Sequence, residues 1–285
     1  MINNLCIIGV GLIGGSLSLA LKSAGQVNQV TGLGRSLENL KIAKQLGVID
    51  QYETDYGKAI SQADLVFVAV PIGAMSEVFK KIAPHLSENT IITDGGSAKK
   101  TVIDAAIEAL GDKVKQFIPG HPIAGTEKSG AGAAFESLYH KRRVILTPLE
   151  DNSNEDINKV RTMWENAGAE VDEMDASHHD LILAGTSHLP HVLAYALVSC
   201  LNKVDDVDEI FKYAAGGFRD FSRIASSDPV MWRDICINNS EAILAMMDSY
   251  QKDIDHIKSA IKNSDADELL EFFNKAKTTR DKFCM

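Results

Sequence analysis

Cysteine is scarce in this sequence: there are four in 285 residues, and none belongs to a C-x-x-C pair. One of the four, Cys6, lies in an apolar stretch that predicts a buried strand. A disulfide framework or a thiolate zinc site requires cysteines that are paired or closely spaced. We therefore expect neither, and we expect the protein to work in the reducing environment of the cytoplasm.

Positive charge is also in short supply, because 29 Lys and Arg residues face 39 Asp and Glu residues and the formal net charge is −10. This balance disfavours binding to nucleic acid or to an anionic membrane surface. No apolar stretch approaches the ~18 residues that a membrane span requires, and the N-terminus lacks the basic region of a signal peptide. An anionic ligand would need the few cations to be gathered locally at its site.

Glycine, in contrast, forms a pattern near the N-terminus. Gly9, Gly11 and Gly14 form a Gly-x-Gly-x-x-Gly turn between an apolar run and a helical pattern. In this dinucleotide-binding fingerprint Gly9 permits the tight turn, Gly11 lets the backbone approach a pyrophosphate, and Gly14 lets the helix pack on the strand. The first N–H groups of the helix, around Leu12 and Ile13, then face the phosphates. The turn predicts a nicotinamide or flavin cofactor.

An acidic residue is missing at the end of the second strand, where NAD-binding folds of this kind place one. Here the strand Gln29–Leu33 is followed by Gly34, Arg35 and Ser36. An acid would repel a 2′-phosphate, whereas an arginine and a hydroxyl can bind it through charge-assisted hydrogen bonds. In the alternative interpretation Arg35 is a solvated loop cation and Ser36 only caps the helix that starts at Leu37. We favour NADP over NAD.

The chain alternates strand and helix up to about residue 172 and shows only helical periodicity after about residue 175. The near-continuous apolar strands predict a parallel sheet that is covered on both faces. We therefore expect an α/β Rossmann-type doubly wound sheet (residues 1–173) followed by an all-α C-terminal domain (174–285). The predicted strands are Leu5–Gly9, Val30–Leu33, Leu65–Val70, Thr90–Thr93, Gln116–Ile118, Val144–Thr147 and Glu170–Val171, and the predicted helices include Met75–His85, Thr101–Leu110, Leu181–Leu201, Val230–Lys262 and Ala266–Phe283.

Three further segments place polar residues where packing does not require them. The first, Thr93–Lys100, lies at the carboxyl end of a predicted strand, and the second, Gly120–Gly130, lies just past another. In a doubly wound sheet that edge is where ligands bind. The third is split between Ser187–His191 and Gly216–Arg223 in the helical part. These segments are the candidate site.

Each segment also has a simpler interpretation. His121 could be a turn residue that is hydrogen-bonded to the backbone. His188 and His191 are three residues apart on a helical face, which would also suit a metal, but no Glu or Cys is spaced to complete a tetrahedral set. We therefore expect no metal. Arg223 could form a surface ion pair with Asp220, which would contribute little stability.

Taken together and in this order, five motifs resemble the prephenate/arogenate (cyclohexadienyl) dehydrogenases of tyrosine biosynthesis, and the similarity spans nearly the whole chain. The replacement of the expected acid by Gly34-Arg35 is a departure from the NAD-using members of that family. The five motifs are GVGLIGGS (Gly9–Ser16), DGGSAK (Asp94–Lys99), HPIAGTEKSG (His121–Gly130), SHLPH (Ser187–His191) and FRDFSRIA (Phe218–Ala225).

The resemblance implies oxidative decarboxylation of a small anionic substrate, prephenate or arogenate or both, with hydride transfer to NADP or NAD. The site would lie between the two domains, in a homodimer that pairs through the helical domain. By resemblance, His121 accepts the proton of the ring hydroxyl, as a neutral histidine can near pH 7, and Ser97 positions the hydroxyl and the nicotinamide. Activity would then rise through a group that titrates near the ordinary histidine pKa of about 6.5. The implied substrate-binding residues are Arg223, His188, Thr126, Glu127, Ser129, Gly130 and His191, and the cofactor-binding residues are Gly9, Gly11, Leu12, Ile13, Gly14, Arg35, Ser36, Val70 and Ser97.

Two other functions are open at this point. A 3-hydroxyacid or imine reductase has a similar Rossmann-plus-helical plan, but those families rely on a catalytic lysine in the helical domain, where this sequence has histidine and arginine. A nicotinamide-sensing binding protein would need no catalytic groups, yet Ser97, His121 and Arg223 are all present. No residue decides between prephenate and arogenate, which differ only in a ketone or an amine on the side chain, and sensitivity to tyrosine is equally unreadable.

Overall fold

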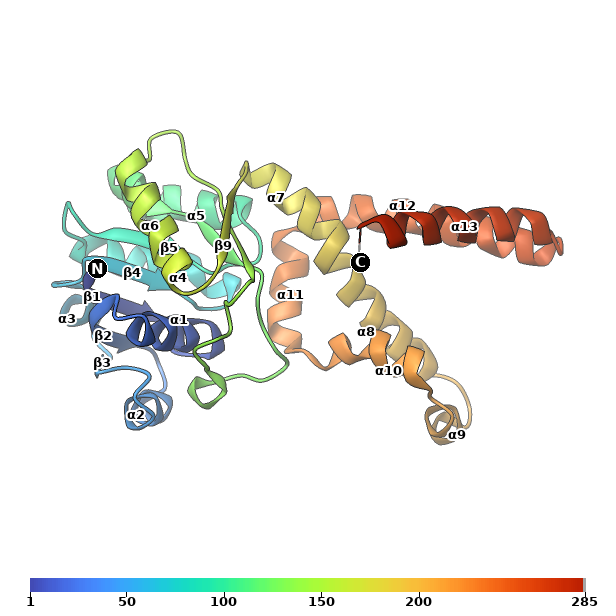
Figure 1. Cartoon of the computed structure of the whole chain (residues 1–285), viewed down its shortest axis with the longest axis horizontal. Coiled ribbons are helices and arrows are strands. Elements are labelled where there is room, and N and C mark those ends of the chain that lie inside the picture. Colours follow the sequence, from blue (N-terminus) through green and yellow to red (C-terminus); the bar gives the residue numbers. More distant parts are fainter. Residues whose placement is uncertain (284–285) are drawn as a thin grey trace. The chain divides into compact units, whose positions relative to one another are not determined.

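The computed structural model describes residues 1–283 and shows a six-stranded parallel sheet in the order β3-β2-β1-β4-β5-β6 (Figure 1). This is the strand order of a dinucleotide-binding doubly wound fold, in which the order reverses between β1 and β4. The predicted Rossmann-type sheet is therefore confirmed. Its strands are β1 (Ile2–Ile8), β2 (Val27–Leu33), β3 (Gln51–Glu53), β4 (Leu65–Val68), β5 (Ile91–Asp94) and β6 (Phe117–Ile118), and its helices are α1 (Leu12–Ser23), α2 (Leu37–Gln45), α3 (Tyr56–Ile60), α4 (Ile72–Ile82), η1 (Ala83–His85), α5 (Lys100–Leu110) and η2 (Gly111–Gln116).

A second, three-stranded sheet contains residues that the sequence placed in the parallel sheet. Its order is β7-β8-β9, with β7 antiparallel to β8 and β8 parallel to β9. His121 lies in the middle of β7 and pairs with Ile145 of β8, so it is not a turn residue. Both β7 and β3 are three residues long, too short to show the alternation that predicts a strand. The elements of this region are β7 (Gly120–Pro122), η3 (Ala131–Ala133), β8 (Arg143–Leu146), α6 (Asn154–Asn166) and β9 (Glu170–Glu173).

Side chains of β1 alternate between two hydrophobic cores, because successive residues of a strand point to opposite faces. Ile7 belongs to the core that contains Trp164 of α6, whereas Cys6 belongs to the core that contains Phe79 of α4. The main sheet is thus covered on both faces, as predicted. Cys6 is fully buried, and burial raises the pKa of its thiol to about 12. The thiol is therefore a packing group rather than a reactive one.

The helical part begins with one continuous helix that contains a single π-helical turn. α7 (Ala176–Leu183) passes through the π turn η4 (Ala184–His188) into α8 (Leu189–Leu201). Pro190 accounts for the turn, since a proline inside a helix has no N–H to donate and its ring meets the carbonyl four residues earlier. The wider π turn accommodates that mismatch. The predicted helix over Leu181–Leu201 began five residues too late.

The helices that follow are interrupted at one buried asparagine. The sequence predicted a single helix over Val230–Lys262, but the structure ends one helix at Asn238 and begins the next at Ser240. Between them, the Asn239 side chain is buried and hydrogen-bonds to residues of α7 and η4. An asparagine side chain that bonds elsewhere competes with helix continuation. The elements are α9 (Val207–Lys212), α10 (Gly216–Ser222), η5 (Arg223–Ser226), α11 (Pro229–Asn238), α12 (Ser240–Lys262) and α13 (Ala266–Phe283).

The chain forms two compact units, one over Met1–Ser240 and one from Glu241 onward. The first unit contains both sheets and the helices up to α11. In the second, α12 and α13 form a helical hairpin, with an ion pair of 2.8 Å between His256 and Glu268. The domain boundary that the sequence places at 173/174 stays a prediction.

The helix Ala176–Leu201 corrects one expectation from the sequence. It contains an 18-residue window that is long and apolar enough, by length and composition alone, to cross a membrane. The statement that no apolar stretch approaches this length was therefore wrong. The same helix carries His179 and Asp180, both buried in a hydrogen-bonded network, although only 28% of the apolar window is buried inside the structure. Ionisable residues of this kind are costly to place in lipid.

Candidate active site

The turn between β1 and α1 has the geometry that the glycine fingerprint predicts. Gly9 has a φ of +97°, and a Cβ there would lie 2.5 Å from the Ala69 carbonyl oxygen, so the fold itself requires glycine. At Gly11, in contrast, a Cβ would meet nothing within 4 Å, and the helix start that follows has no side-chain cap. Open space beside uncapped helix N–H groups fits the pyrophosphate of a dinucleotide. The other predicted cofactor residues at this turn are Leu12, Ile13, Gly14 and Val70.

The corner after β2 presents Arg35 to solvent and turns Ser36 toward the backbone. Ser36 caps α2, because its Oγ accepts the N–H of Asn39 at 3.2 Å. Arg35 is exposed near an ion pair of α4, in which Glu77 and Lys81 are 2.7 Å apart. Lys81, and to a smaller degree Arg35, hold the pKa of the Glu77 carboxyl below its usual value. The Arg35 side chain is therefore placed for a ligand or for solvent.

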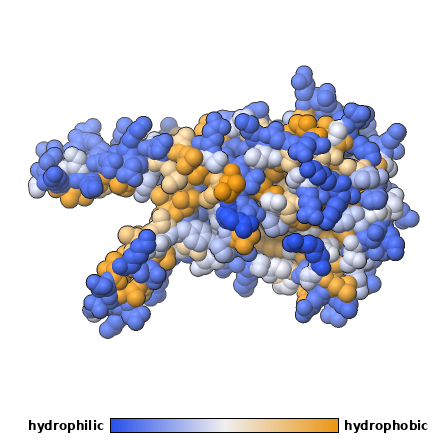
Figure 2. All heavy atoms as spheres, turned by 180° about the vertical axis from the view of Figure 1, so that it is seen from behind, coloured by the Kyte–Doolittle hydropathy of each residue, from blue (hydrophilic) through white to orange (hydrophobic). Residues whose placement is uncertain are grey.

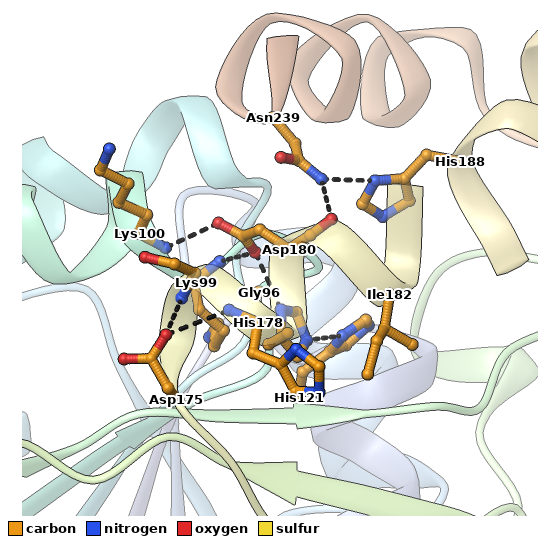
Figure 3. A network of polar contacts seen from close by, with 12 residues as sticks. Gly96, Lys99, Lys100, His121, Asp175, His178, Asp180, Ile182, His188 and Asn239 are labelled. Carbon is orange, nitrogen blue, oxygen red and sulfur yellow. Dashed lines mark hydrogen bonds and ion pairs between the residues drawn. The ribbon is translucent and has the colours of Figure 1, made fainter. Parts of the chain in front are cut away.

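A chain of hydrogen bonds connects β7, α7 and the start of α5 (Figure 3). His121 Nδ1 lies 2.9 Å from His179 Nε2, and His179 Nδ1 lies 2.8 Å from Asp180 Oδ1. The Asp180 carboxylate also accepts the backbone N–H groups of Lys99 at 2.8 Å and Lys100 at 3.0 Å. His121, His179 and Asp180 are all buried. The network thus brings residues from three elements to the carboxyl edge of the main sheet, where ligands bind in such folds.

A buried ion pair adjoins this network. Lys99 Nζ lies 2.5 Å from Asp94 Oδ2 and 2.7 Å from the Gly120 carbonyl oxygen, and both charged side chains are fully buried. Asp94 also accepts the N–H groups of Gly96 at 2.7 Å and Gly120 at 3.0 Å. The pair therefore holds the N–H and the carbonyl of the residue just before His121. It joins β7 to the end of β5.

The titrating groups of the network are displaced from their ordinary pKa values. Burial holds the pKa of His121 well below the usual value, and the neighbouring His179 and Lys99 add to the shift. Burial lowers the pKa of His179 as well, although its hydrogen bond to Asp180 opposes the change. Burial alone would raise the pKa of Asp180, but the hydrogen bonds from His179 and from two backbone N–H groups outweigh it and lower that pKa. Near neutral pH the two imidazoles are therefore neutral and the carboxylate is ionised.

Two buried polar atoms near this network have no partner. Asn239 Nδ2 lies 2.8 Å from the Asp180 carbonyl oxygen and 3.0 Å from His188 Nδ1. A carbonyl only accepts, so the Asn239 amide donates to both atoms. Burial lowers the pKa of His188 to about 4, so the neutral ring carries its proton on Nε2. Within residues 1–283, His188 Nε2 and Trp232 Nε1 are buried and make no hydrogen bond. Two such donors fit an anionic acceptor.

The structure brings several of the predicted substrate residues to these donors. The backbone of Ser97 lies near the His188 ring and raises its pKa slightly, against the larger effect of burial. It does not form a hydrogen bond with His188 Nε2. His191 stacks on Trp232, with ring centroids 3.7 Å apart. Burial lowers the pKa of His191, and the nearby Arg223 contributes to the shift. Arg223 is exposed, and no ion pair is recorded for it in the described part of the chain.

The loop 126–130 has no hydrogen bond to His121 in the described structure. Its predicted substrate residues Thr126, Glu127 and Ser129 are exposed, and Gly130 is half-buried. The chain just after the loop is connected through Asn39 to the glycine turn between β1 and α1. The Asn39 side chain accepts the N–H of Ala131 at 3.1 Å and donates to the Val10 carbonyl at 2.7 Å. Among residues 1–283, no hydrogen bond, ion pair or ring contact joins this loop to the histidines. Its role in substrate binding stays a prediction.

Five residues that the structure places in or beside the network had no role predicted from the sequence: His179, Asp180, Lys99, Trp232 and Asn239. A signal existed for the first two, because a His-Asp pair follows the last predicted strand and opens an otherwise apolar helix. Lys99 belongs to a recognised motif but had no assigned function. Within the described chain, no group of three or more His, Cys, Asp or Glu side chains is placed to hold a metal ion.

Comparison with known proteins identifies two family models that together match most of the chain. "Prephenate dehydrogenase, nucleotide-binding domain" matches residues 17–173, and "Prephenate dehydrogenase, dimerization domain" matches residues 175–275. Among curated proteins, a cyclohexadienyl dehydrogenase of Zymomonas mobilis is 37% identical over 97% of this chain and 94% of its own length. A prephenate dehydrogenase of Bacillus subtilis is 35% identical over 99% of this chain and 76% of its own length.

Solved structures of prephenate and arogenate dehydrogenases are also similar to this chain over nearly its full length. A prephenate dehydrogenase of Aquifex aeolicus in complex with hydroxyphenyl propionate and NAD+ is 36% identical, with a TM-score of 0.92 over 99% of this chain and 98% of that one. An arogenate dehydrogenase of Synechocystis is 28% identical, with a TM-score of 0.82 over 98% and 99% of the two chains. A pyrroline carboxylate reductase of Plasmodium falciparum, 13% identical with a TM-score of 0.52, shares the fold alone.

Proposed function

Because this chain belongs to the prephenate dehydrogenase family, we propose that it oxidises and decarboxylates prephenate, arogenate or both in tyrosine biosynthesis, with a nicotinamide cofactor as hydride acceptor. One observation carries the proposal: the buried neutral His121 lies within electrostatic reach of His188, whose Nε2–H has no partner. A proton acceptor thus lies near a donor for an anionic group. A few convergent polar groups of this kind are typical of small-molecule sites.

The chain's own residues have separate tasks in this reaction. The start of α1 and the turn at Gly9 and Gly11 would hold the pyrophosphate of the cofactor, which would supply the acceptor for the hydride of ring C4. His121 accepts the proton of the C4 hydroxyl as that carbon becomes a carbonyl. Ser97 positions the hydroxyl. The C1 carboxylate then leaves as carbon dioxide, and the electrons of the broken bond enter the ring and place a negative charge on the C4 oxygen. The proton held by His121 returns to that oxygen, and the phenol forms.

Turnover with each substrate and each cofactor tests the proposal. We expect the absorbance of the reduced cofactor to rise with prephenate, with arogenate or with both, and the ratios of kcat/KM give the preference. A chain that turns over neither substrate with either cofactor contradicts the proposal and favours a nicotinamide-sensing protein. Turnover of a 3-hydroxyacid or an imine instead favours the reductase alternative.

The substrate carboxylates require donors, and we assign them to His188 and Arg223. The unpartnered Nε2–H of His188 is buried. The exposed Arg223 lies near His191, whose ring stacks on Trp232 beside His188. Truncation of Arg223 removes a charge-assisted hydrogen bond, which contributes about 1.5–3 kcal/mol. We therefore expect Arg223→Ala to raise the KM for the substrate about 10- to 100-fold.

The affinity for the cofactor separates this role from a structural one. Arg223→Ala should leave the dissociation constant of the reduced cofactor, measured by fluorescence titration, unchanged. Arg143→Ala is the matched control, because Arg143 is also exposed but lies in β8, paired with Asp172. Equal losses for substrate and cofactor would show that Arg223 supports the fold rather than the substrate.

The cofactor is NADP in our proposal, although the Aquifex aeolicus relative holds NAD+. The exposed Arg35 side chain and the absence of an acid at Gly34 support this choice. We expect Arg35→Ala to weaken NADPH binding in fluorescence titrations and to leave NADH binding nearly unchanged, because only the 2′-phosphate needs the charge. Gly34→Asp should shift the preference toward NAD. If the wild-type enzyme uses NAD faster than NADP at equal low concentrations, the NADP proposal is wrong and Arg35 is only a surface cation.

The matched dimerization-domain model supports a homodimer formed through the helical part. On α12, Met247, Tyr250, Ile254 and Ile261 are exposed at helical spacing, and Figure 2 shows apolar residues along the helical parts of the molecule. Such faces mark interaction surfaces when they are extended. Light scattering should give twice the 30.9 kDa of the chain. Free thiols at Cys6, Cys200 and Cys236 agree with the cytoplasmic location that we propose.

A further inference from the structure

We propose that Asp180 and His179 are positioning residues that fix the tautomer of His121, so that its proton is on Nδ1 and its Nε2 is the free acceptor. The inference rests on the proposed function for the role of His121, but the tautomer itself is a property of the free protein. A neutral histidine in water populates both tautomers. A site that needs an acceptor at one ring nitrogen gains from a partner that holds the proton on the other.

The first step is the anchor at Asp180. Its two oxygens accept the backbone N–H groups of Lys99 and Lys100 at 2.8 and 3.0 Å, so a side chain of α7 caps the N-terminus of α5. Helix N–H groups and the positive end of the helix dipole favour an anion there. The carboxylate is therefore ionised, is held at a fixed orientation, and can only accept hydrogen bonds.

The second step transmits this restriction through His179. Since Asp180 Oδ1 only accepts, the nitrogen 2.8 Å from it, His179 Nδ1, carries the proton. A neutral His179 then has no proton on Nε2. That bare nitrogen lies 2.9 Å from His121 Nδ1, which must donate to it. Figure 3 shows His121 and Asp180 within this continuous network.

The third step is the charge balance that keeps both rings neutral. The groups that face them are Lys99 and Asp94 from the β5–α5 corner, Asp180 from α7 and His188 from η4. The fully buried Lys99 disfavours a second positive charge on either ring, and burial acts in the same direction. With both rings neutral, only one arrangement of protons satisfies the hydrogen bonds from Asp180 through His179 to His121. In that arrangement Nε2 of His121 carries no proton.

The test is the tautomer of His121 in the substrate-free protein, read from the ¹⁵N chemical shifts of ¹⁵N-histidine-labelled samples and assigned by the signals that His121→Asn removes. We expect wild-type Nδ1 to be protonated and Nε2 bare. His179→Phe retains a ring but offers no acceptor, so His121 should shift toward the Nε2–H tautomer. Its kcat should fall about 10- to 10³-fold, within the range of a misplaced general base, while KM stays near the wild-type value.

His178→Phe is the matched control, because His178 is the adjacent histidine and its side chain is exposed. It should change neither the ¹⁵N pattern nor kcat. Asp180→Asn should alter the pattern in the same direction as His179→Phe, and thermal melting reports how much stability the lost helix cap contributes. If Asp180→Asn does not fold, His179→Phe decides alone.

A wild-type His121 with its proton on Nε2, or an unchanged Nδ1–H in His179→Phe, overturns the inference. These outcomes are distinct from failure of the proposed function. A protein that turns over neither substrate but shows the expected ¹⁵N pattern contradicts the proposed function and leaves the tautomer assignment intact.

Discussion

We expect His121→Asn to lower kcat by about 10²–10⁴, which is the usual contribution of a positioned general base. In the proposed mechanism a free ring nitrogen of His121 accepts the hydroxyl proton, and asparagine retains polarity without a base. Since the proposed carboxylate donors His188 and Arg223 are unchanged in this variant, KM for the substrate should change little. Steady-state kinetics with prephenate and arogenate measure both constants.

His178→Asn provides the comparison, because this exposed histidine of the same protein is outside the network. Its kcat should equal that of the wild type. A His121→Asn enzyme that retained most of its kcat would remove His121 from the mechanism.

The structure changes the pH dependence that we expect for the wild-type enzyme. From the sequence, activity was expected to rise near the ordinary histidine pKa of about 6.5. Burial and the neighbouring His179 and Lys99 hold the pKa of His121 well below that value. Because the neutral ring is the active form, a lowered pKa keeps the enzyme active to lower pH. The acidic limb of the kcat/KM profile should therefore lie below pH 6.5.

Lys99→Met should lower the free energy of unfolding by about 3–5 kcal/mol, because it leaves a buried carboxylate without its counter-charge. Asp94 is fully buried, and its remaining partners are the N–H groups of Gly96 and Gly120. Those hydrogen bonds orient the carboxylate but do not neutralise it. Urea unfolding at pH 7 measures the loss.

Two further variants separate charge pairing from packing. Lys80→Met removes an exposed lysine that pairs with Glu108 at 2.8 Å, and such surface pairs contribute about 0–1 kcal/mol. Lys99→Met combined with Asp94→Asn removes both buried charges and should recover part of the stability. If Lys99→Met is no more destabilising than Lys80→Met, the buried pair does not hold β7 in place.

Local patterns made part of this molecule predictable. The glycine turn could be interpreted because the spacing of its glycines and the positive φ of Gly9 are properties of the local backbone. The change from alternating strands and helices to helices alone is also visible in residue periodicity. These features depend on residues that are neighbours in the sequence.

The hydrogen-bonded network was beyond such reasoning. His121 and His179 are separated by 58 residues, and their contact exists only because β7 and α7 meet at one edge of the sheet. The break at Asn239 likewise depends on partners in α7 and η4 rather than on its own helix. Motif resemblance pointed to His121 and His188, but only the tertiary structure gives the neighbours of each ring nitrogen, from which the positions of the protons are inferred.

The π turn between α7 and α8 sets the angular phase of the active-site helix. Each residue of an α-helix advances about 100°, so positions nine apart, such as 179 and 188, would lie on opposite faces. The N–H of Leu189 instead donates to the carbonyl of Ala184, five residues earlier, and this wider turn absorbs about one residue of rotation. His188 is thereby rotated back by roughly a quarter turn toward the side of His179. The number of residues between these two histidines is therefore as constrained as their identity, since a single deletion or insertion there would put one of them out of phase with the other.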